Sequence, residues 1–408
     1  MIKVVENIRI EEYNYHLPDE AIAKYPLPDR DKSKLLIYKD NTISQDFFNN
    51  IKKYLPVKST LFVNDSRVIQ ARIFFTKSTG AKIEVFCLEP LQPQDYYSCF
   101  SQTQSCVWKC IAGNLKKWKN EILTKKVVFK GKEITLTAEK TENSGTHISA
   151  HFRWNHNLTF SEILEIFGKT PLPPYLNREA EEKDKQTYQT VYSSRNGSVA
   201  APTAGLHFSE KLISELNAHK INIETLTLHV GAGTFKPVKA ACLKNHEMHT
   251  EFFSVNKKTI EKLASNNPYT IVGTTSLRTI ESLYYIAQKI KKHDFKFHVS
   301  QWEPYSGQIN CTSTEALNII LEYLDENNLN ELSGSTQIMI APGFQFQFAK
   351  TLITNFHQPQ STLLLLIAAF IGISWKEVYD YALLNNFRFL SYGDSMFLEK
   401  KPSKTSKN

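Results

Sequence analysis

The stretch YTIVGTTSLRTIESLYYIAQKIKK, residues 269–292, changes its pattern of apolar residues part of the way along. Residues 269–275 are mostly β-branched and predict a strand that ends in a glycine and two threonines. Residues 276–292 have apolar side chains at helical spacing and predict a helix. A strand that passes directly into a helix is typical of folds in which helices cover the faces of a sheet.

The same alternation extends over much of the chain. Further helical segments are expected at residues 47–55, 159–169, 209–219, 256–267 and 312–324, and further strands at residues 34–38, 59–65, 222–230 and 336–342. Thr159 with Glu162 and Thr312 with Glu315 form capping boxes, and Ser209 is the expected cap of a third helix. The sequence therefore predicts an α/β (mixed α+β) core with a large mixed sheet.

Residues 73–152 have a different pattern of residue types. They consist of short β-branched or aromatic segments separated by Gly, Asn and Lys, with little helical periodicity. This pattern predicts a small antiparallel β-barrel domain inserted into the core. The core is then discontinuous, with residues 1–72 and 153–399, and residues 400–408 are expected to form a disordered basic tail.

Composition excludes several classes of protein. The chain has 408 residues, of which 41% are hydrophobic and 22% charged, as in globular proteins. Its longest apolar run, Leu363 to Ile373, is too short to cross a bilayer, and the N-terminus does not resemble a signal peptide. Six scattered cysteines indicate free thiols in the cytoplasm rather than disulfides or a zinc site. The net charge of +8 favours a polyanionic partner such as a nucleic acid, although a lysine-rich solvated surface would give the same excess.

Two segments place candidate binding groups beside the N-terminus of a helix. SVAAPTAGLHFS, residues 198–209, is a run of small residues that ends in His207 and Phe208 just before an expected helix. VGTTSLRTIES, residues 272–282, places three hydroxyls at a helix start and Arg278 one turn later. Free N–H groups at such ends attract carboxylates and phosphates. A tightly packed turn and a solvent-facing arginine are the alternative interpretations.

Histidines also occur at other element boundaries. His229 ends an expected strand beside Gly231 and Gly233, but the third glycine of a dinucleotide fingerprint is missing. His246 and His249 lie in HEMHTE, where the spacing differs from the metalloprotease pattern, so no metal site is expected. These histidines are candidates for proton transfer or for orienting a substrate, with ordinary surface histidines as the alternative.

Polar residues directly precede a very apolar helix near the C-terminus. Thr354, Asn355 and His357 need partners there, and a ligand is one such partner. Nearer the N-terminus, Asp65 and Arg67 lie in a turn-like setting next to a strand. Ion pairing within the core would explain these two residues equally well.

Taken together, ten sequence blocks resemble the S-adenosylmethionine:tRNA ribosyltransferase-isomerase family. The blocks are YPLPDRDKSKLL, VNDSRVIQAR, PLPPYLNR, YQTVYSSRNGSVAAPTAGLHF, LHVGAGTFKPV, HEMHTE, VGTTSLRTIES, APGFQF, TNFHQPQSTLL and SYGD. They run from about residue 15 to residue 394, which is nearly the whole chain.

The resemblance implies an enzyme of queuosine biosynthesis with an α/β core and an inserted β-barrel. Such an enzyme transfers and isomerises the ribosyl unit of S-adenosylmethionine onto 7-aminomethyl-7-deazaguanine at the wobble position of tRNA. The product is epoxyqueuosine-tRNA, and adenine and methionine are released. S-adenosylmethionine is then a consumed co-substrate, and no cofactor or metal is implied. The implied partners are tRNA and S-adenosylmethionine, with neither a membrane nor an obligate protein partner.

This chemistry suggests roles for residues in the matching blocks. His207, His229 and His249 are the candidates for acid and base, and we expect them to share one cleft at the ends of core strands. The candidate substrate-binding residues are Asp65, Arg67, Phe208, Thr274, Thr275, Ser276, Arg278, Asn355 and His357. Among these, Arg278 suits the methionine carboxylate and Phe208 a stacked base. Lys116, Lys117 and Lys119 are the expected contacts to RNA.

Some positions depart from the family pattern. Lys34, Gln70 and Gln360 stand where arginine, proline and lysine are usual, and the segment of residues 285–335 is longer than expected. Lysine in place of arginine loses bidentate geometry. A paralogue with altered specificity and a catalytically silent RNA-binding paralogue therefore remain alternatives.

Overall fold

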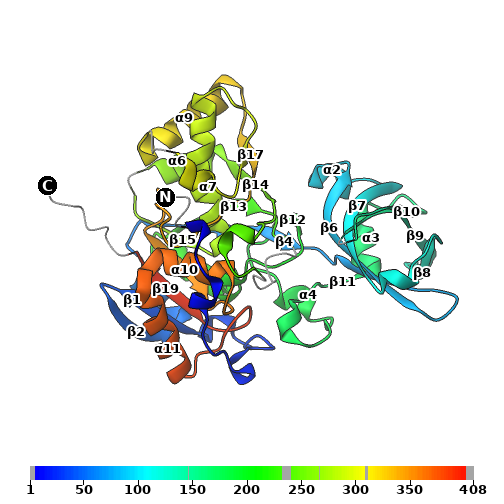
Figure 1. Ribbon diagram of the computed structural model, residues 1–408, viewed down its shortest axis with the longest axis horizontal. Coiled ribbons are helices and arrows are strands. Elements are labelled where there is room, and N and C mark those ends of the chain that lie inside the picture. The colour runs from blue at the N-terminus through cyan, green and yellow to red at the C-terminus, as the bar shows by residue number, and fades with distance from the viewer. Residues whose placement is uncertain (1–4, 146, 232–239, 266, 308–310, 401–408) are drawn as a thin grey trace.

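Two large sheets organise the chain, and a third sheet has only two short strands (Figure 1). The computed structural model describes residues 5–145, 147–231, 240–265, 267–307 and 311–400. The larger sheet has ten strands in the order β16-β17-β14-β13-β3-β15-β18-β19-β1-β2. Their bounds are β16 His298–Val299, β17 Glu331–Thr336, β14 Glu251–Asn256, β13 Asn222–Leu228, β3 Thr60–Asn64, β15 Tyr269–Val272, β18 Thr351–Asn355, β19 Ser395–Glu399, β1 Lys34–Lys39 and β2 Thr42–Phe47.

The centre of this sheet is parallel. Strands β13, β3, β15 and β18 run in one direction, and antiparallel β14 and β19 flank them. The carboxyl ends of the four parallel strands therefore meet at one edge, together with the starts of β14, β19 and β1. In open α/β sheets this edge is where ligands bind.

Helices bury both faces of the large sheet, which explains why the central strand β3 is buried at every position. Leu61 and Val63 face a cluster that includes Leu212 and Leu216, whereas Phe62 between them faces the larger cluster that includes α7. The helices of the core are α4 Asp184–Thr187, α5 Glu210–Ala218, α6 Lys257–Ala264, α7 Thr274–Lys291, α8 Glu303–Ser306, α9 Ser313–Glu326, α10 Thr362–Ile371 and α11 Trp375–Leu384. Two short parallel strands, β4 Ser66–Val68 and β12 Arg195–Ser198, pair beside the sheet.

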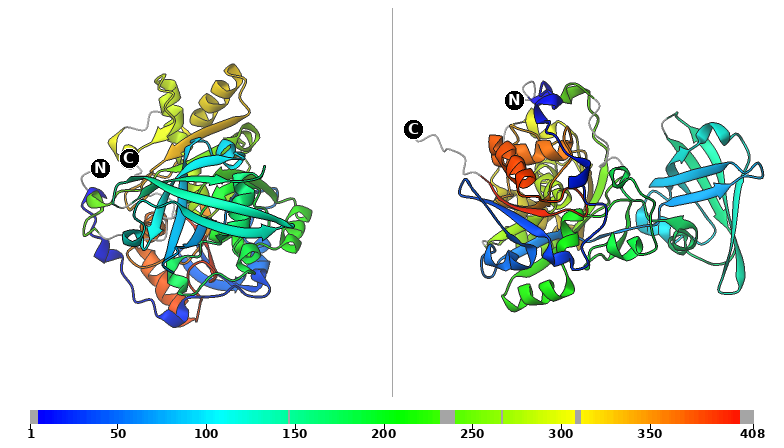
Figure 2. Two further views of the ribbon diagram at one scale, coloured as in Figure 1. Left: turned by 90° about the vertical axis from the view of Figure 1, so that its right-hand side faces the viewer. Right: turned by 90° about the horizontal axis from the view of Figure 1, so that it is seen from below.

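The second sheet lies to one side of the core (Figure 2). Its order is β11-β5-β6-β7-β10-β9-β8, and its pairs are antiparallel. The strands are β11 Gly168–Lys169, β5 Arg72–Thr76, β6 Lys82–Gln92, β7 Ser105–Gly113, β10 Ile148–Trp154, β9 Lys132–Asn143 and β8 Leu123–Phe129, with helices α2 Tyr96–Phe100 and α3 Phe160–Phe167. Among the described residues no pairing joins β8 to β11, so this is a half-barrel and the expected closed barrel is not confirmed.

Helix α3 belongs to the second sheet and not to the core. Its buried residues Phe160, Ile163, Leu164 and Phe167 join the cluster around Trp108 of β7. The unit of the second sheet therefore runs from Arg72 to Lys169, further than the expected residues 73–152.

The local signals of the sequence are largely confirmed. Both capping boxes and the cap at Ser209 are present. The strand expected at residues 336–342 is wrong, because β17 ends at Thr336 and the next six residues continue without strand pairing. The helical segment at residues 47–55 is a short 3-10 helix, Phe48–Lys53.

The long segment of residues 285–335 is part of the core. Helix α9 buries Leu317, Ile320 and Leu324 in the cluster that also holds α7, so this segment extends the helical layer over the sheet. The apolar run from Thr362 to Leu384 is long enough to cross a membrane by length and composition, but it is split at Gly372 and 61% of its most apolar window is buried. That burial is typical of a core helix.

Glu281 anchors the turn before β18. Its carboxylate is fully buried and accepts backbone N–H groups from Gln347 at 2.8 Å, Phe348 at 3.1 Å and Ala349 at 2.9 Å. Burial raises the pKa of Glu281, and the three N–H donors oppose that shift. This carboxylate ties α7 to the start of a central strand.

Replacing Glu281 by Gln should lower the free energy of unfolding by about 1–3 kcal/mol, because the new amide N–H group would face backbone donors. Denaturant unfolding measures this change, and Glu326→Gln on the exposed end of α9 is the control. Equal stability of the Glu281→Gln protein and the parent chain would contradict this role.

Candidate active site

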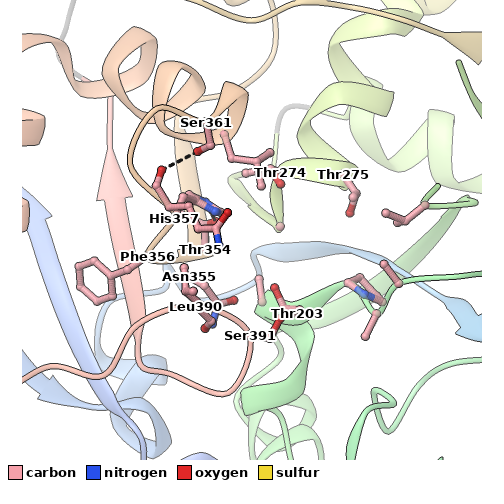
Figure 3. A pocket seen from close by; sticks show the side chains of 18 of the residues that line it. Thr203, Thr274, Thr275, Thr354, Asn355, Phe356, His357, Ser361, Leu390 and Ser391 are labelled. Atoms are coloured by element: carbon pink, nitrogen blue, oxygen red, sulfur yellow. Dashed lines mark hydrogen bonds between the residues drawn. The ribbon is translucent and has the colours of Figure 1, made fainter. Parts of the chain in front are cut away.

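A pocket opens at the edge where the parallel strands end, and we call it the strand-end pocket (Figure 3). It is lined by residues 200–204, 273–275 and 354–358, and by Tyr175, Val230, Ser361, Leu363, Leu390 and Ser391. Figure 3 shows Thr274 and Thr275 on one side of the pocket and Thr354, Asn355 and His357 on the other. Most of its polar groups are hydroxyls and amides, which suit a ligand with several hydroxyl and amino groups.

The small-residue segment forms one wall because larger side chains would not fit. An added Cβ at Gly205 would lie 2.0 Å from the hydroxyl oxygen of Tyr192. Residues Thr203–His207 form a 3-10 turn in which Ala204 and Leu206 are buried. The run of small residues thus lets this turn pack closely against the core while Pro202 and Thr203 reach the pocket.

The start of α7 forms a second wall, next to Ala204. Gly273 has φ +89°, a conformation that other residues rarely adopt, and it turns the chain directly from β15 into α7. No side chain caps α7, so its first N–H groups are available at the pocket. The positive end of this helix dipole favours an anion or another hydrogen-bond acceptor.

His207 lies behind the pocket wall. Its Nδ1 is 2.8 Å from Ser33 Oγ, and its Nε2 accepts a hydrogen bond from Asn355 Nδ2 at 3.1 Å. The neutral ring therefore carries its proton on Nδ1 and donates it to Ser33. Burial, with smaller contributions from Arg388 and Arg30, lowers the pKa of His207 to about 3.

Asn355 connects His207 to the pocket. Its Nδ2 also donates to the carbonyl of Leu390 at 3.2 Å, which fixes the orientation of the amide. Its buried Oδ1 has no partner among the described residues, although Asn355 lines the strand-end pocket. Ser33 and His207 thus hold an amide with one unused acceptor at the pocket.

His357 is also held in a neutral state. Its Nε2 lies 3.0 Å from Thr354 Oγ1, and its backbone N–H donates to the hydroxyl of Tyr379 at 3.1 Å. Burial lowers the pKa of His357 to about 3. This histidine can therefore orient a ligand through hydrogen bonds at neutral pH, but it carries no charge there.

A second hollow lies on the other side of Leu363, and we call it the arginine pocket. Arg278 and His249 line it, and Glu251 forms an ion pair with Nη1 of Arg278. The Nε and Nη2 atoms of Arg278 are buried and have no hydrogen-bond partner within the described part of the chain. They are therefore two donors in a fork that matches a carboxylate.

Both hollows are narrow in this structure. Their free volumes are about 70 Å³ for the strand-end pocket and about 40 Å³ for the arginine pocket. Pockets that enclose small molecules usually measure ~300–1,000 Å³. The walls must move apart before a nucleoside can enter.

His229 is separated from the other two candidate histidines. It lines a large cleft between the core and α2, where its ring stacks on Tyr96 with centroids 4.3 Å apart. Burial and the charge of Arg195 lower the pKa of His229 to about 4. The prediction that His207, His229 and His249 share one cleft is therefore wrong for the described residues.

Other predicted site residues lie in the core or on the surface. The Asp65 carboxylate is buried and accepts hydrogen bonds from Thr227 Oγ1 at 2.7 Å and Ser194 Oγ at 2.9 Å, so it joins β3, β13 and the segment before β12. The ring of Phe208 is fully buried against Phe48 and has no face open to a ligand.

Arg67 is exposed on β4, and Ser276 is buried in the first turn of α7 with an Oγ that has no partner among the described residues.

Lys116, Lys117 and Lys119 lie just beyond the Gly113 end of β7, next to the Lys82 end of β6. Helix α2 follows the opposite end of β6, about 30 Å away along an eleven-residue strand. These lysines are therefore distant from α2.

Sequence reasoning missed several residues of the site. Thr203, Ser361 and Ser391 line the strand-end pocket, Ser33 orients His207, and Glu251 holds Arg278. Each of them lies within one of the blocks that carry the family resemblance, which was the available signal. No group of His, Cys, Asp and Glu among the described residues could hold a metal ion.

The family model described as "Queuosine biosynthesis protein" matches residues 10–398. The chain belongs to this family. The match includes every block that builds the two pockets, from Ser33 before β1 to Ser391 before β19.

Relatives in this family carry a common name. The chain is 34% identical over 401 residues to an S-adenosylmethionine:tRNA ribosyltransferase-isomerase of a Nitratiruptor species, covering 97% of this chain and 100% of the relative. It is 34% identical to the protein of that name from a Sulfurihydrogenibium species, covering 96% and 100%. A solved S-adenosylmethionine tRNA ribosyltransferase from Thermotoga maritima is 26% identical, with a TM-score of 0.45 over 95% of this chain and 99% of that one.

The lowered pKa of His207 predicts a pH effect on stability. The unfolded state binds a proton near pH 6.5 and the folded state only near pH 3, so stability falls as the pH drops between these values. The free energy of unfolding should fall between pH 7 and pH 5 in both proteins. This fall should be about 2 kcal/mol smaller in His207→Gln than in the parent chain. Urea unfolding at both pH values measures this, with exposed His16→Gln as the control. An equal loss in the parent and His207→Gln proteins would mean that His207 is protonated in the folded state.

Proposed function

We propose that this chain is an S-adenosylmethionine:tRNA ribosyltransferase-isomerase of queuosine biosynthesis. The observation that carries the proposal is the family match over residues 10–398, together with relatives of that name aligned over their whole length. The acceptor is 7-aminomethyl-7-deazaguanine at the wobble position of tRNA. The products are epoxyqueuosine-tRNA, adenine and methionine.

The reaction requires two proton transfers that the protein can assist. The sulfonium of S-adenosylmethionine acidifies the neighbouring C5′–H of the ribose, so a positioned base can remove that proton. Adenine leaves more readily when an acid protonates it. Groups that titrate near neutrality suit both steps.

The two adjoining pockets supply a site for S-adenosylmethionine. The fork of Arg278 faces the methionine carboxylate in the arginine pocket, and the nucleoside occupies the strand-end pocket. There Thr274, Thr275 and the N–H groups of α7 donate to ribose oxygens, and Asn355 Oδ1 accepts from a hydroxyl or amino group. The sulfonium then lies near Leu363, which both pockets share.

The three candidate histidines take different roles in this arrangement. His249 is exposed and lines the arginine pocket, so it is the histidine best placed to exchange a proton with the substrate. His207 touches neither pocket and acts through Asn355 as a positioning residue. His229 lines the large cleft between the core and α2 and not the strand-end pocket.

The remaining expectations are part of the same proposal. S-adenosylmethionine is a consumed co-substrate, and the reaction proceeds without a metal or a resident cofactor. The protein acts in the cytoplasm, and Lys116, Lys117 and Lys119 contact the tRNA backbone away from the anticodon.

Adenine release tests this function. The protein should release one adenine for each tRNA modified when it is incubated with S-adenosylmethionine and tRNA that carries the aminomethyl-deazaguanine. Chromatography detects the adenine, and mass spectrometry detects the added ribosyl-derived unit on the tRNA. RNA binding without adenine release would indicate a silent paralogue, and release only with another acceptor would indicate altered specificity.

Replacing Arg278 by Lys should weaken S-adenosylmethionine binding. Lysine keeps the charge that faces Glu251 but loses the Nε and Nη2 donors. Losing hydrogen bonds to a charged group costs about 1.5–3 kcal/mol, so the Kd should rise about ten- to hundredfold. Calorimetric titration measures this, with exposed Arg153→Lys on β10 as the control. An unchanged Kd would exclude Arg278 from the carboxylate site.

A further inference from the structure

A large open cleft separates α2 from the edge of the core sheet, and we call it the aromatic cleft. Its volume is about 1,160 Å³, and its walls come from α2, β14, β17 and residues 295–298. Figure 1 shows α2 on the side of the second sheet that faces β14 and β17. Unlike the two pockets, this cleft can admit a ring-sized ligand without any movement of its walls.

Exposed aromatic rings gather in this cleft. Tyr97 is 82% exposed, Phe295 55% and Phe252 44%, and they come from α2, the loop before β16, and β14. Large apolar side chains on a surface usually mark a binding site when they are clustered. Three separate segments of the chain thus present open ring faces to one space.

Further rings pack against two of the exposed ones, Phe295 and Phe252. Phe295 stacks on Tyr323 with centroids 5.6 Å apart, and the stacked pair of Tyr96 and His229 also lines the cleft. Tyr96 contacts Phe252 edge to face at 6.4 Å. Rings that are held in this way lose little freedom when a flat ligand stacks on them.

The aromatic cleft adjoins the strand-end pocket along the chain. His229 lines the cleft and Val230, the next residue, lines the pocket. Likewise, residues 194–196 line the cleft and residues 200–204 line the pocket. A single-stranded ligand that lies in the aromatic cleft can therefore continue towards the strand-end pocket.

We propose that the aromatic cleft binds unpaired nucleobases of an RNA loop by stacking them on Tyr97, Phe252 and Phe295. This inference rests on the proposed function, because it assigns the place where the anticodon bases next to the wobble position are held. Every base has a flat face, so stacking of this kind tolerates many sequences.

RNA, rather than an apolar peptide, is the occupant that the proposed function implies. Arg195 and Lys296 line the cleft and can face phosphates, and the chain as a whole has a net charge of +8. Asp95 and Glu331 also line it, and Glu331 forms an ion pair with Arg195. The local balance is therefore nearly neutral, and the aromatic rings carry most of the specificity for single-stranded loops.

Binding of an anticodon stem-loop RNA tests the inference. The single variants Tyr97→Ala, Phe252→Ala and Phe295→Ala should each raise the Kd about five- to hundredfold, which corresponds to losing about 1–3 kcal/mol of stacking per base. Fluorescence anisotropy of a labelled hairpin measures the Kd. Phe252→Trp should retain binding, because it restores a stacking surface.

A second readout reports stacking itself. A hairpin with 2-aminopurine in the loop should lose fluorescence when the parent chain binds it, and the three alanine variants should quench it less. Phe47→Ala is the matched control, because Phe47 is 53% exposed on β2 at the opposite end of the large sheet. Its affinity and quenching should equal those of the parent chain.

The outcomes separate this inference from the proposed function. If the parent chain releases adenine but all three variants bind and quench as it does, the aromatic cleft does not hold RNA bases. If the parent chain binds the hairpin through these rings but releases no adenine, the cleft is supported and the proposed reaction fails. Unchanged S-adenosylmethionine affinity in the variants shows that their fold and nucleoside site are intact.

Discussion

The carboxyl ends of four parallel strands meet at one edge of the sheet, and the rest of the site depends on that edge. Strands β13, β3, β15 and β18 all end there, so their last polar groups face one another in a buried region. Buried polar atoms that lack a partner cost about 1–3 kcal/mol each. Most of them are therefore paired within the protein: Asn64 bonds the backbone of Leu228, and Asp65 bonds Thr227 and Ser194.

The atoms that stay unpaired at this edge indicate where a ligand completes the network. Among the residues that line the two pockets they are Asn355 Oδ1 and Nε and Nη2 of Arg278, within the part of the chain that the structure describes. A ligand that satisfies them recovers the free energy that their burial costs. On the proposed assignment, the narrow pockets enclose S-adenosylmethionine once it is bound, and the wider aromatic cleft holds the larger RNA.

Local patterns in the sequence predicted the elements of the fold but not all of their neighbours. The strand and helix around Gly273 and the caps at Ser209 and Thr312 depend on nearby residues, and the sequence reveals such features. The attachment of α3 to the second sheet depends on contacts with Trp108, more than fifty residues away. The burial of Phe208 and the separation of His229 from His207 depend in the same way on tertiary partners, Phe48 and Tyr96. No periodicity encodes those partners.

A crystal structure with bound S-adenosylmethionine tests the central claim most directly. We predict that the nucleoside lies between Thr274 and Asn355 and that the methionine carboxylate is paired with Arg278, with the walls around Leu363 moved apart. Density for the ligand only in the aromatic cleft, or at a surface distant from the strand ends, would contradict this claim.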